Sequence, residues 1–415
     1  MITTNNSDDL SERIAAWLSE SYSERTSFWS FERSLGATLG TARGSVRSEN
    51  QDRVLCARYT PRKNRGEPWT LFALADGMGG MQEGAKCAEI ALSVIVKTFL
   101  ESENGPLQDK VARSVVAANR RLYELYKNRG GTTLSAIILA AGEVCLVNVG
   151  DSRIYTFQSG ASQVGEGRFR QVTTDDTIAG ELERLKGVRL PDSHREHLSN
   201  QLAQYLGLGD GLEPHFYGPK EISAEDGYLI TSDGAHDLAL ETFARLVLTS
   251  PTGADTVKRV LQVATWIGGF DNASVICIEP GSLTNFGVGR QNYAGILALW
   301  NGDSRFEILL ESKTDPNSAL PEGPLSLAAR QVKKGKKKLR RIDNQHRGLN
   351  LRGTKDGDDE PPLDVNKYRP ADGDQHDGKS NERQCELNIQ IGLDDEHPEN
   401  EKSEKPEKSE KPEKP

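Results

Sequence analysis

Apolar residues along the first 280 positions form two kinds of pattern. Spacings of three and four residues predict amphipathic helices, and short apolar runs beside turn residues predict strands. We expect helices over residues 8–22, 88–99, 111–125, 238–248 and 254–266. We expect strands at residues 71–75, 134–139, 144–148, 228–231 and 274–279. Because helices and strands come in blocks, the pattern favours an α+β fold over a doubly wound parallel sheet.

The first predicted helix carries one apolar stripe, with Ile14, Trp17 and Leu18 at helical spacing. We expect this stripe to pack on the domain that follows rather than dock a partner. A later pair of apolar runs, Ile296–Trp300 and Phe306–Leu310, flanks Asn301-Gly302 and predicts a hairpin.

Composition changes after Pro280, and beyond Lys313 too little apolar surface remains to offset the entropy of an ordered chain. We therefore expect a helical extension (1–30), a central domain (31–282), a small hairpin (283–312) and a disordered charged tail (313–415). The tail contains a basic block at 333–341, and its last residues repeat Glu-Lys with Ser or Pro.

Charge and cysteine usage exclude several classes of protein. The net charge of -9 argues against electrostatic nucleic-acid binding by the whole molecule. The five cysteines are scattered, without a C-x-x-C pair, which argues against a disulfide framework and a zinc site. The N-terminus does not read as a secretion signal, and no run of about 18 apolar residues predicts a membrane span. We therefore expect a cytoplasmic protein.

Four aspartates far apart in the chain lie in similar local contexts. They occur in the turns Asp76-Gly77, Gly150-Asp151, Asp233-Gly234 and Asp271-Asn272, each next to a predicted strand. Carboxylates gathered at one sheet edge would repel one another and resist ionisation, so a hard divalent cation is their natural partner.

The aspartates belong to a longer ordered set of motifs. This set resembles the PP2C (PPM) family of metal-dependent serine/threonine protein phosphatases, bacterial type, from about Gly36 to Glu279. The matching segments are residues 46–52, 75–80, 131–133, 148–153, 231–234 and 268–274. Each motif is weak alone, and the order of all six carries the resemblance. It implies a four-layer α-β-β-α sandwich of two antiparallel sheets flanked by helices, with metals at one end.

The resemblance assigns roles to individual residues. It implies that Asp76 bridges two Mn²⁺ or Mg²⁺ ions, and that the Gly77 carbonyl binds the second ion. It implies that Asp233 and Asp271 complete the first ion's ligands, and that Asp52, with the neighbouring glutamine, contacts metal-bound water.

Two further residues take roles from the same resemblance. Arg47 is similar to the arginine that clamps the substrate phosphate, for which a planar guanidinium is well suited. Asp151 is similar to a residue that holds a third, weaker ion together with Asp233. A pair with Arg153, or a turn cap, is an equally open interpretation of Asp151.

The implied function is hydrolysis of phosphoserine and phosphothreonine in proteins by a metal-bridged hydroxide, opposing a Ser/Thr kinase. Met78 departs from family members that have a proton-donating histidine there. The alternatives are a catalytically silent phosphoprotein-binding scaffold and an enzyme for small phosphate esters. The set of aspartates is intact, which favours an enzyme. The basic block at 333–341 is interpreted either as a solvated part of the tail or as a site for an acidic partner or nucleic acid.

Overall fold

A computed structural model describes ten parts of the chain. They are residues 6–23, 27–61, 66–78, 83–102, 105–158, 169–187, 190–191, 198–283, 295–310 and 330–331. All of them belong to the first of two units, residues 1–338. The glycines at 79 and 80, the basic block and the rest of the expected tail lie outside the described residues.

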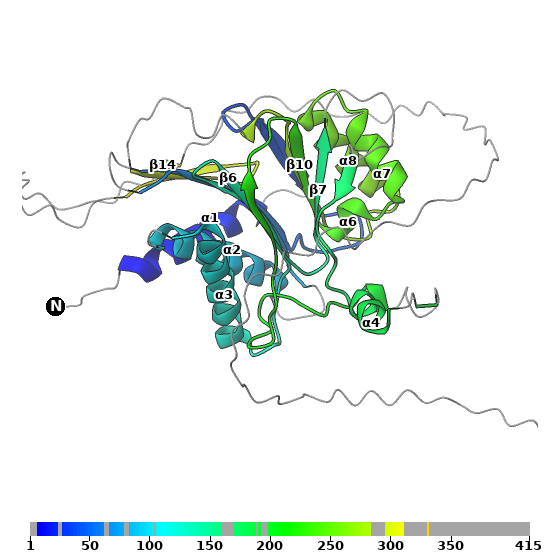
Figure 1. Ribbon diagram of the computed structural model, residues 1–415, viewed down its shortest axis with the longest axis horizontal. Coiled ribbons are helices and arrows are strands. Elements are labelled where there is room, and N and C mark those ends of the chain that lie inside the picture. The colour runs from blue at the N-terminus through cyan, green and yellow to red at the C-terminus, as the bar shows by residue number, and fades with distance from the viewer. Residues whose placement is uncertain are drawn as a thin grey trace, which may run out of the picture. The chain divides into compact units, whose positions relative to one another are not determined.

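Two antiparallel sheets form the centre of this unit (Figure 1). The six-stranded sheet has the order β1 (Ser27–Glu32), β2 (Ala37–Ala42), β11 (Ala273–Ile278), β10 (Asp226–Thr231), β7 (Arg153–Gln158), β8 (Phe169–Gln171). The eight-stranded sheet has the order β14 (Arg330–Gln331), β13 (Arg305–Leu309), β12 (Ile296–Trp300), β3 (Asp52–Thr60), β4 (Trp69–Asp76), β5 (Leu134–Ala140), β6 (Glu143–Val149), β9 (His215–Glu221).

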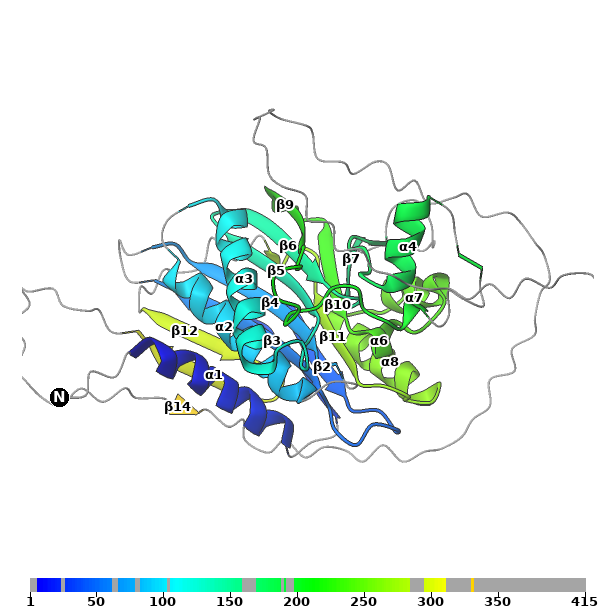
Figure 2. The same cartoon turned by 90° about the horizontal axis from the view of Figure 1, so that it is seen from below.

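Helices cover the outer face of each sheet (Figure 2). The eight-stranded sheet carries α1 (Asn6–Ser23), α2 (Gly84–Glu101) and α3 (Leu107–Tyr126). The six-stranded sheet carries α7 (Leu240–Leu248) and α8 (Gly253–Trp266). Two shorter helices, α4 (Ile178–Lys186) and α6 (Asp233–His236), follow β8 and β10. These four layers confirm the expected α-β-β-α sandwich.

Three apolar clusters hold the layers together. The central cluster lies between the sheets and includes Leu39, Phe72, Tyr228 and Ile276, each fully buried. The other two lie between each sheet and its helices. Central strands such as β4 are therefore buried on both faces, which explains why their sequences are nearly continuous apolar runs.

The predicted elements are confirmed, with small shifts of their ends. The predicted turn at Ala141-Gly142 joins β5 to β6, and both residues have positive φ, 52° and 81°. Leu125, near the end of α3, is 44% exposed.

The strands β1, β2 and β3 have no counterpart among the predicted elements. The polar residues interspersed in β1 and β2 hide the alternation that marks a strand. Their hydrogen-bonding partners come from the far end of the chain, since β2 pairs with β11.

The hairpin of β12 and β13 is confirmed as an element, and β12 pairs with β3 to extend the eight-stranded sheet. Two residues inside the expected tail, Arg330 and Gln331, pair with β13 as β14.

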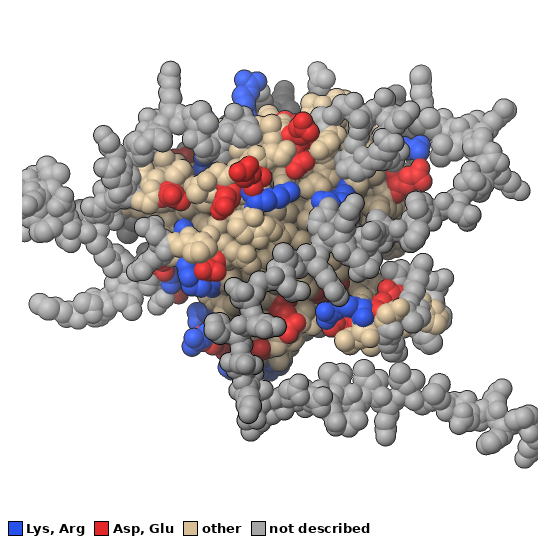
Figure 3. All heavy atoms as spheres, in the orientation of Figure 1, with Lys and Arg blue, Asp and Glu red and all other residues tan. Residues whose placement is uncertain are grey.

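The first helix packs as predicted. Ile14 and Leu18 are fully buried against α2 and the eight-stranded sheet, and Trp17 stacks on Phe306 of β13 at 6.0 Å between ring centroids. Within the described residues, none of the helices combines the length and hydrophobicity needed to cross a bilayer. On the face seen in Figure 3, the described acidic and basic side chains are interspersed.

Candidate metal and phosphate site

The ends of five strands bring the predicted aspartates together at one end of the sandwich. Asp52 opens β3 and Asp76 closes β4, and the two are direct partners in the antiparallel register. Asp233 begins α6 immediately after β10, and Asp271 precedes β11, so both come from the six-stranded sheet. Asp151 follows β6.

Burial and mutual repulsion raise the pKa values of the Asp52, Asp76, Asp151 and Asp233 carboxyl groups. Burial, followed by the charges of Asp233 and Asp271, raises the pKa of Asp52 to about 7. Burial and the charge of Asp233 raise the pKa of Asp151 to about 8. Burial raises the pKa of Asp233 to about 6, and burial with four neighbouring aspartates raises the pKa of Asp76 well above its usual range. These shifts describe the cluster without a cation, whose charge would lower them.

Arg47 lies in the exposed segment before β3 and reaches the same cluster. Its Nη2 donates to Asp271 Oδ2 at 2.6 Å. The hydrogen bond to Asp271 and the charges of Asp233 and Asp76 raise the pKa of the guanidinium. The phosphate clamp expected from the sequence therefore lies beside the carboxylates, paired with one of them.

Hydroxyl groups fix the orientation of Asp52 and Asp76. Ser232 Oγ donates to Asp52 Oδ2 at 2.8 Å, and accepts from the Ser274 backbone N–H. Thr133 Oγ1 accepts from the Asp76 N–H, and its own N–H donates to the Asp76 carbonyl. The contact between Ser232 and Asp52 joins the two sheets where the carboxylates meet.

The turn that carries Asp151 is held by a different acidic residue. Gly150, with φ of +99°, donates its N–H to Asp176 Oδ2 at 2.9 Å, and its carbonyl accepts from the Asp176 N–H. Arg153 forms a two-pronged ion pair with Asp175, at 2.6 and 3.0 Å. The salt bridge of Arg153 is therefore with Asp175, and not with Asp151 as the alternative interpretation held.

The donor set is suited to a hard divalent cation. Asp52 Oδ1 is buried and has no hydrogen-bond partner among the described residues. Among the described residues, no group of three or more His, Cys, Asp or Glu side chains stands ready to hold a metal ion. Some rotation of the carboxylates would therefore accompany metal binding.

Glycine is required where the backbones beside Asp76 meet. Gly77 forms a bridge with Thr132, and a Cβ on Gly77 would stand 2.3 Å from the carbonyl of Gly84 in α2. Met78 follows and donates its N–H to the Gly131 carbonyl at 3.1 Å. The start of α2 is therefore packed directly against the carbonyl expected to bind metal.

Several residues that support the site were missed by the sequence analysis. Asn272 donates to the carbonyls of Arg43 and Glu49, and its Oδ1 accepts from the Gln51 N–H. Arg53 donates to the carbonyls of Asn50 and Asp52. Their position next to Asp271 and Asp52 in the motifs was the available signal for a supporting role. The contacts of Asn272 could not be predicted from it, because they join segments more than 200 residues apart.

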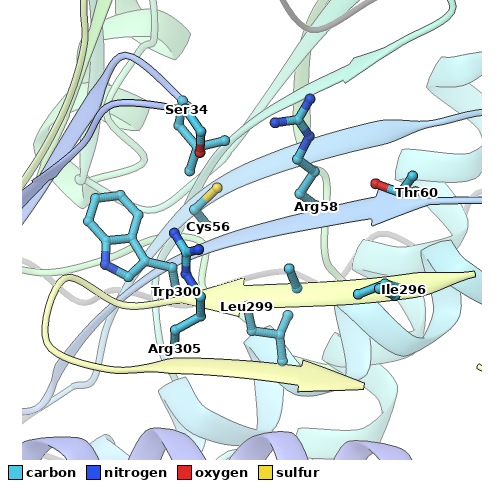
Figure 4. A pocket seen from close by; sticks show the side chains of 10 residues that line it. Ser34, Cys56, Arg58, Thr60, Ile296, Leu299, Trp300 and Arg305 are labelled. Carbon is cyan, nitrogen blue, oxygen red and sulfur yellow. The ribbon is translucent and has the colours of Figure 1, made fainter. Parts of the chain in front are cut away.

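A pocket of about 340 Å³ lies away from the carboxylates (Figure 4). It lies on the second half of β3, where Cys56 and Arg58 face Trp300 of β12 and Arg305 of β13. None of its lining residues is acidic, and Arg305 is ion-paired with Glu32. The carboxylate cluster remains the candidate site because it combines oxygen donors suited to a metal ion with the arginine expected to bind phosphate.

Comparison with known proteins agrees with this geometry. The family model for protein phosphatase 2C matches residues 39–211. The chain is similar to the serine/threonine protein phosphatase PstP of Mycobacterium tuberculosis, with 29% identity over 242 residues, 57% of this chain and 43% of PstP. It is also similar to the protein phosphatase PhpP of Streptococcus pneumoniae, with 28% identity over 251 residues, 58% of this chain and 96% of PhpP.

Among solved structures, the chain is similar to the catalytic domain of PstP in complex with two manganese ions. The identity is 28%, the TM-score is 0.46, and the match covers 61% of this chain and 98% of that domain. The chain spans less than half of the full length of PstP. With six family motifs in order and their aspartates at one end of the expected sandwich, the chain belongs to the protein phosphatase 2C family.

Proposed function

We propose that this protein removes phosphate from phosphoserine and phosphothreonine in proteins, using Mn²⁺ or Mg²⁺. The observation that supports this function is the meeting of five buried or half-buried carboxylates with one arginine. Phosphate monoesters resist hydrolysis strongly, so an enzyme must neutralise the phosphoryl oxygens and supply a nucleophile at neutral pH. An acidic cluster with a guanidinium beside it offers groups for both tasks.

The proposed ligands are the carboxylates of Asp52, Asp76, Asp233 and Asp271, together with the Gly77 carbonyl. Asp151 with Asp233 is proposed for a third, weaker ion. Oxygen ligands of this kind favour Mn²⁺ and Mg²⁺ over zinc. When bound, two such ions supply Lewis acidity and a water of lowered pKa, the source of the attacking hydroxide.

Arg47 binds the phosphate of the substrate in this proposal. Its guanidinium is held at the edge of the cluster by Asp271, 2.6 Å away, and is 45% exposed. A phosphate group and a carboxylate compete for the same planar donor, so Arg47 changes partner when substrate binds. Asp271 is then released from the ion pair and becomes available as a ligand.

The protein itself offers no side chain at position 78 to protonate the leaving group, because the Met78 thioether is not a proton donor. We assign this task to water, oriented by Asp52 at the start of β3. We also propose direct attack without a phosphoenzyme. A single turnover in ¹⁸O-water, quenched early, tests this: a trapped phosphoprotein would contradict direct attack.

The test of the function is phosphate release from a phosphothreonine peptide with Mn²⁺, with Mg²⁺ and with chelator. We expect the Asp76→Asn and Asp233→Asn variants to lose activity at least about a hundredfold, since each removes a proposed ligand. Asp210→Asn, at an exposed position, is the matched control. Wild-type rates in either site variant would refute the ligand assignment. A comparison with small phosphate esters tests whether proteins are the preferred substrates.

Three further statements belong to the same proposal. A Ser/Thr kinase supplies the phosphorylated substrates, the protein acts in the cytoplasm, and the basic block at 333–341 binds an acidic partner or nucleic acid. Cys56, Cys87, Cys145 and Cys277 are buried and form no disulfide among the described residues, which is compatible with a reducing compartment. Salt-sensitive retention of the full chain on nucleic acid, lost when the block is neutralised, would support the last statement.

A further inference from the structure

Large apolar side chains are exposed beside the proposed phosphate-binding arginine. Among the described residues, the four most exposed large hydrophobic side chains are Trp266 (85%), Leu185 (71%), Phe270 (67%) and Val46 (64%). Three of these four lie within five residues of Arg47 or Asp271 in the sequence. Single exposed apolar residues are common on proteins, but a group beside a candidate site suggests binding.

Backbone contacts join the two segments that carry these side chains. The N–H groups of Ser45 and Val46 both donate to the Gly269 carbonyl, at 2.8 and 3.2 Å. The Arg47–Asp271 ion pair joins the same segments through side chains. Val46 and Phe270 therefore lie in two joined segments beside Arg47, and Trp266 lies at the end of α8, four residues before Phe270. We call the exposed side chains of Val46, Trp266 and Phe270 the apolar platform.

Close backbone approach fixes the shape of this platform. A Cβ on Gly44 would stand 2.4 Å from the Asp271 carbonyl oxygen, so only glycine permits the approach. A Cβ on Gly268, whose φ is +139°, would stand 2.3 Å from the Phe270 ring. The ring thus lies over a glycine that has no side chain to displace it. Phe270 is presented to solvent in a defined place.

The chain of a bound substrate would run across or beside this platform. A phosphate held by Arg47 places the phosphorylated residue at the platform, and each neighbouring residue of an extended peptide advances by about 3.3 Å. Side chains within about three residues of the phosphorylated one are therefore within reach of Phe270 and Trp266. An apolar or aromatic side chain would gain from the contact because both partners leave water.

We propose that the apolar platform of Val46, Trp266 and Phe270 is a docking surface for an apolar side chain of the substrate, close in sequence to the phosphorylated residue. This inference rests on the proposed phosphatase function and adds a preference among phosphoproteins. A second copy of this chain is the competing occupant, and the experiment distinguishes the two.

The experiment uses the full chain with Mn²⁺ and a series of phosphothreonine peptides. Each position from three before to three after the phosphothreonine is serine in one peptide and leucine in its partner. The measured quantity is the ratio of kcat/KM for the leucine peptide to that for the serine peptide. A general change of activity cancels in this ratio. We expect wild type to favour leucine by roughly three- to tenfold at one or two positions.

The variants Trp266→Ser and Phe270→Ser should bring this ratio close to one. Val116→Ser is the matched control, because Val116 is 55% exposed on α3, which covers the other sheet. The control should keep the wild-type ratio. A wild-type ratio of one at every position, or an unchanged ratio in both platform variants, would overturn the proposal.

Two additional measurements separate the remaining explanations. Calorimetry with the same peptides gives the leucine-to-serine ratio of binding affinities without turnover, so it tests the platform even if no peptide is hydrolysed. Absence of hydrolysis would refute only the proposed function. Sedimentation shows the oligomeric state. A dimer that dissociates in Trp266→Ser, with an unchanged peptide ratio, would mean that a second copy covers the platform and that the proposal is wrong.

Discussion

Two histidines around the cluster respond to pH in opposite directions. His236 in α6 is buried, with Nδ1 2.8 Å from Thr231 Oγ1, and burial lowers its pKa well below the usual value. His215 in β9 lies 2.7 Å from Asp176, and this hydrogen bond raises its pKa. The two histidines therefore provide a pair with opposite contributions to the pH dependence of stability.

The sign for each histidine follows from proton binding. Below pH about 6.5, the unfolded chain binds a proton at position 236 that the folded chain does not bind. The free energy of unfolding therefore decreases as the pH decreases. At position 215 the folded chain binds the proton more tightly. Its contribution is complete below pH about 6.5 and is lost as pH rises through the raised pKa.

We predict that His236→Gln reduces the loss of unfolding free energy between pH 7 and 5, compared with wild type. His215→Gln should increase that loss. Urea denaturation at several pH values, in the presence of chelator, measures both. Because the carboxylates are the same in all three proteins, their contribution cancels in the comparison. Parallel pH curves for wild type and His236→Gln would contradict the assignment.

At the scale of elements, a buried ion pair connects α2 to the start of β3. Arg53 Nη2 and Glu89 Oε1 are 2.7 Å apart, and both side chains are almost fully buried. The Tyr22 ring of α1 lies 4.2 Å from the Arg53 guanidinium carbon. Arg53 also donates to the Asp52 carbonyl at 2.9 Å. Two helices therefore support the strand end that carries a proposed metal ligand.

We predict that Glu89→Leu lowers the free energy of unfolding by about 3–5 kcal/mol, because it leaves the Arg53 charge buried and unpaired. The double variant Arg53→Met with Glu89→Leu should regain much of this stability. It should not regain full phosphatase activity, because the donors to the Asn50 and Asp52 carbonyls are lost. Urea denaturation and peptide dephosphorylation measure the two properties.

The exposed pair Arg245–Glu241 on α7 provides the control for this prediction. Removal of an exposed ion pair changes stability by less than about 1 kcal/mol, so Glu241→Gln should unfold like wild type. A similarly small effect of Glu89→Leu would show that the buried pair does not support the fold.

For the whole molecule, the carboxylate cluster lowers the stability of the metal-free protein, although the proposed function requires it. Without a cation, the buried aspartates repel one another and are poorly solvated. We predict that Asp233→Asn raises the melting temperature of chelator-treated protein by a few degrees, because it removes one of these charges. In a purely structural turn the same substitution would be neutral or destabilising.

Metal binding should stabilise the wild type more than this variant. At about one hundred times its Kd, a cation that binds only the folded state adds about 2.7 kcal/mol, or roughly 5 °C in a domain of this size. We expect Mn²⁺ to stabilise wild type and Asp210→Asn by this order, and to stabilise Asp233→Asn much less. Thermal denaturation with Mn²⁺ and with chelator measures this. No stabilisation of wild type at millimolar Mn²⁺ would contradict a metal site.

The sequence by itself determined many of the regular elements and the identity of the acidic positions. Elements such as α3 and the hairpin of β5 and β6 follow local rules of apolar spacing and turn chemistry. These rules depend only on residues within about ten positions of one another. The motifs around Asp76 and Asp233 are likewise local. The family, and with it the fold class, could therefore be predicted before any contact was known.

Only the tertiary structure decided what surrounds those positions. The pairing of β2 with β11, the clamp of Asn272 on the segment before β3, and the meeting of Arg47 with Asp271 join residues more than 200 positions apart. The apolar platform also joins segments more than 200 positions apart. From their chemistry alone, its exposed side chains would be expected in a core. Such contacts depend on how two sheets stack and end together, and local propensity contains no information about that geometry.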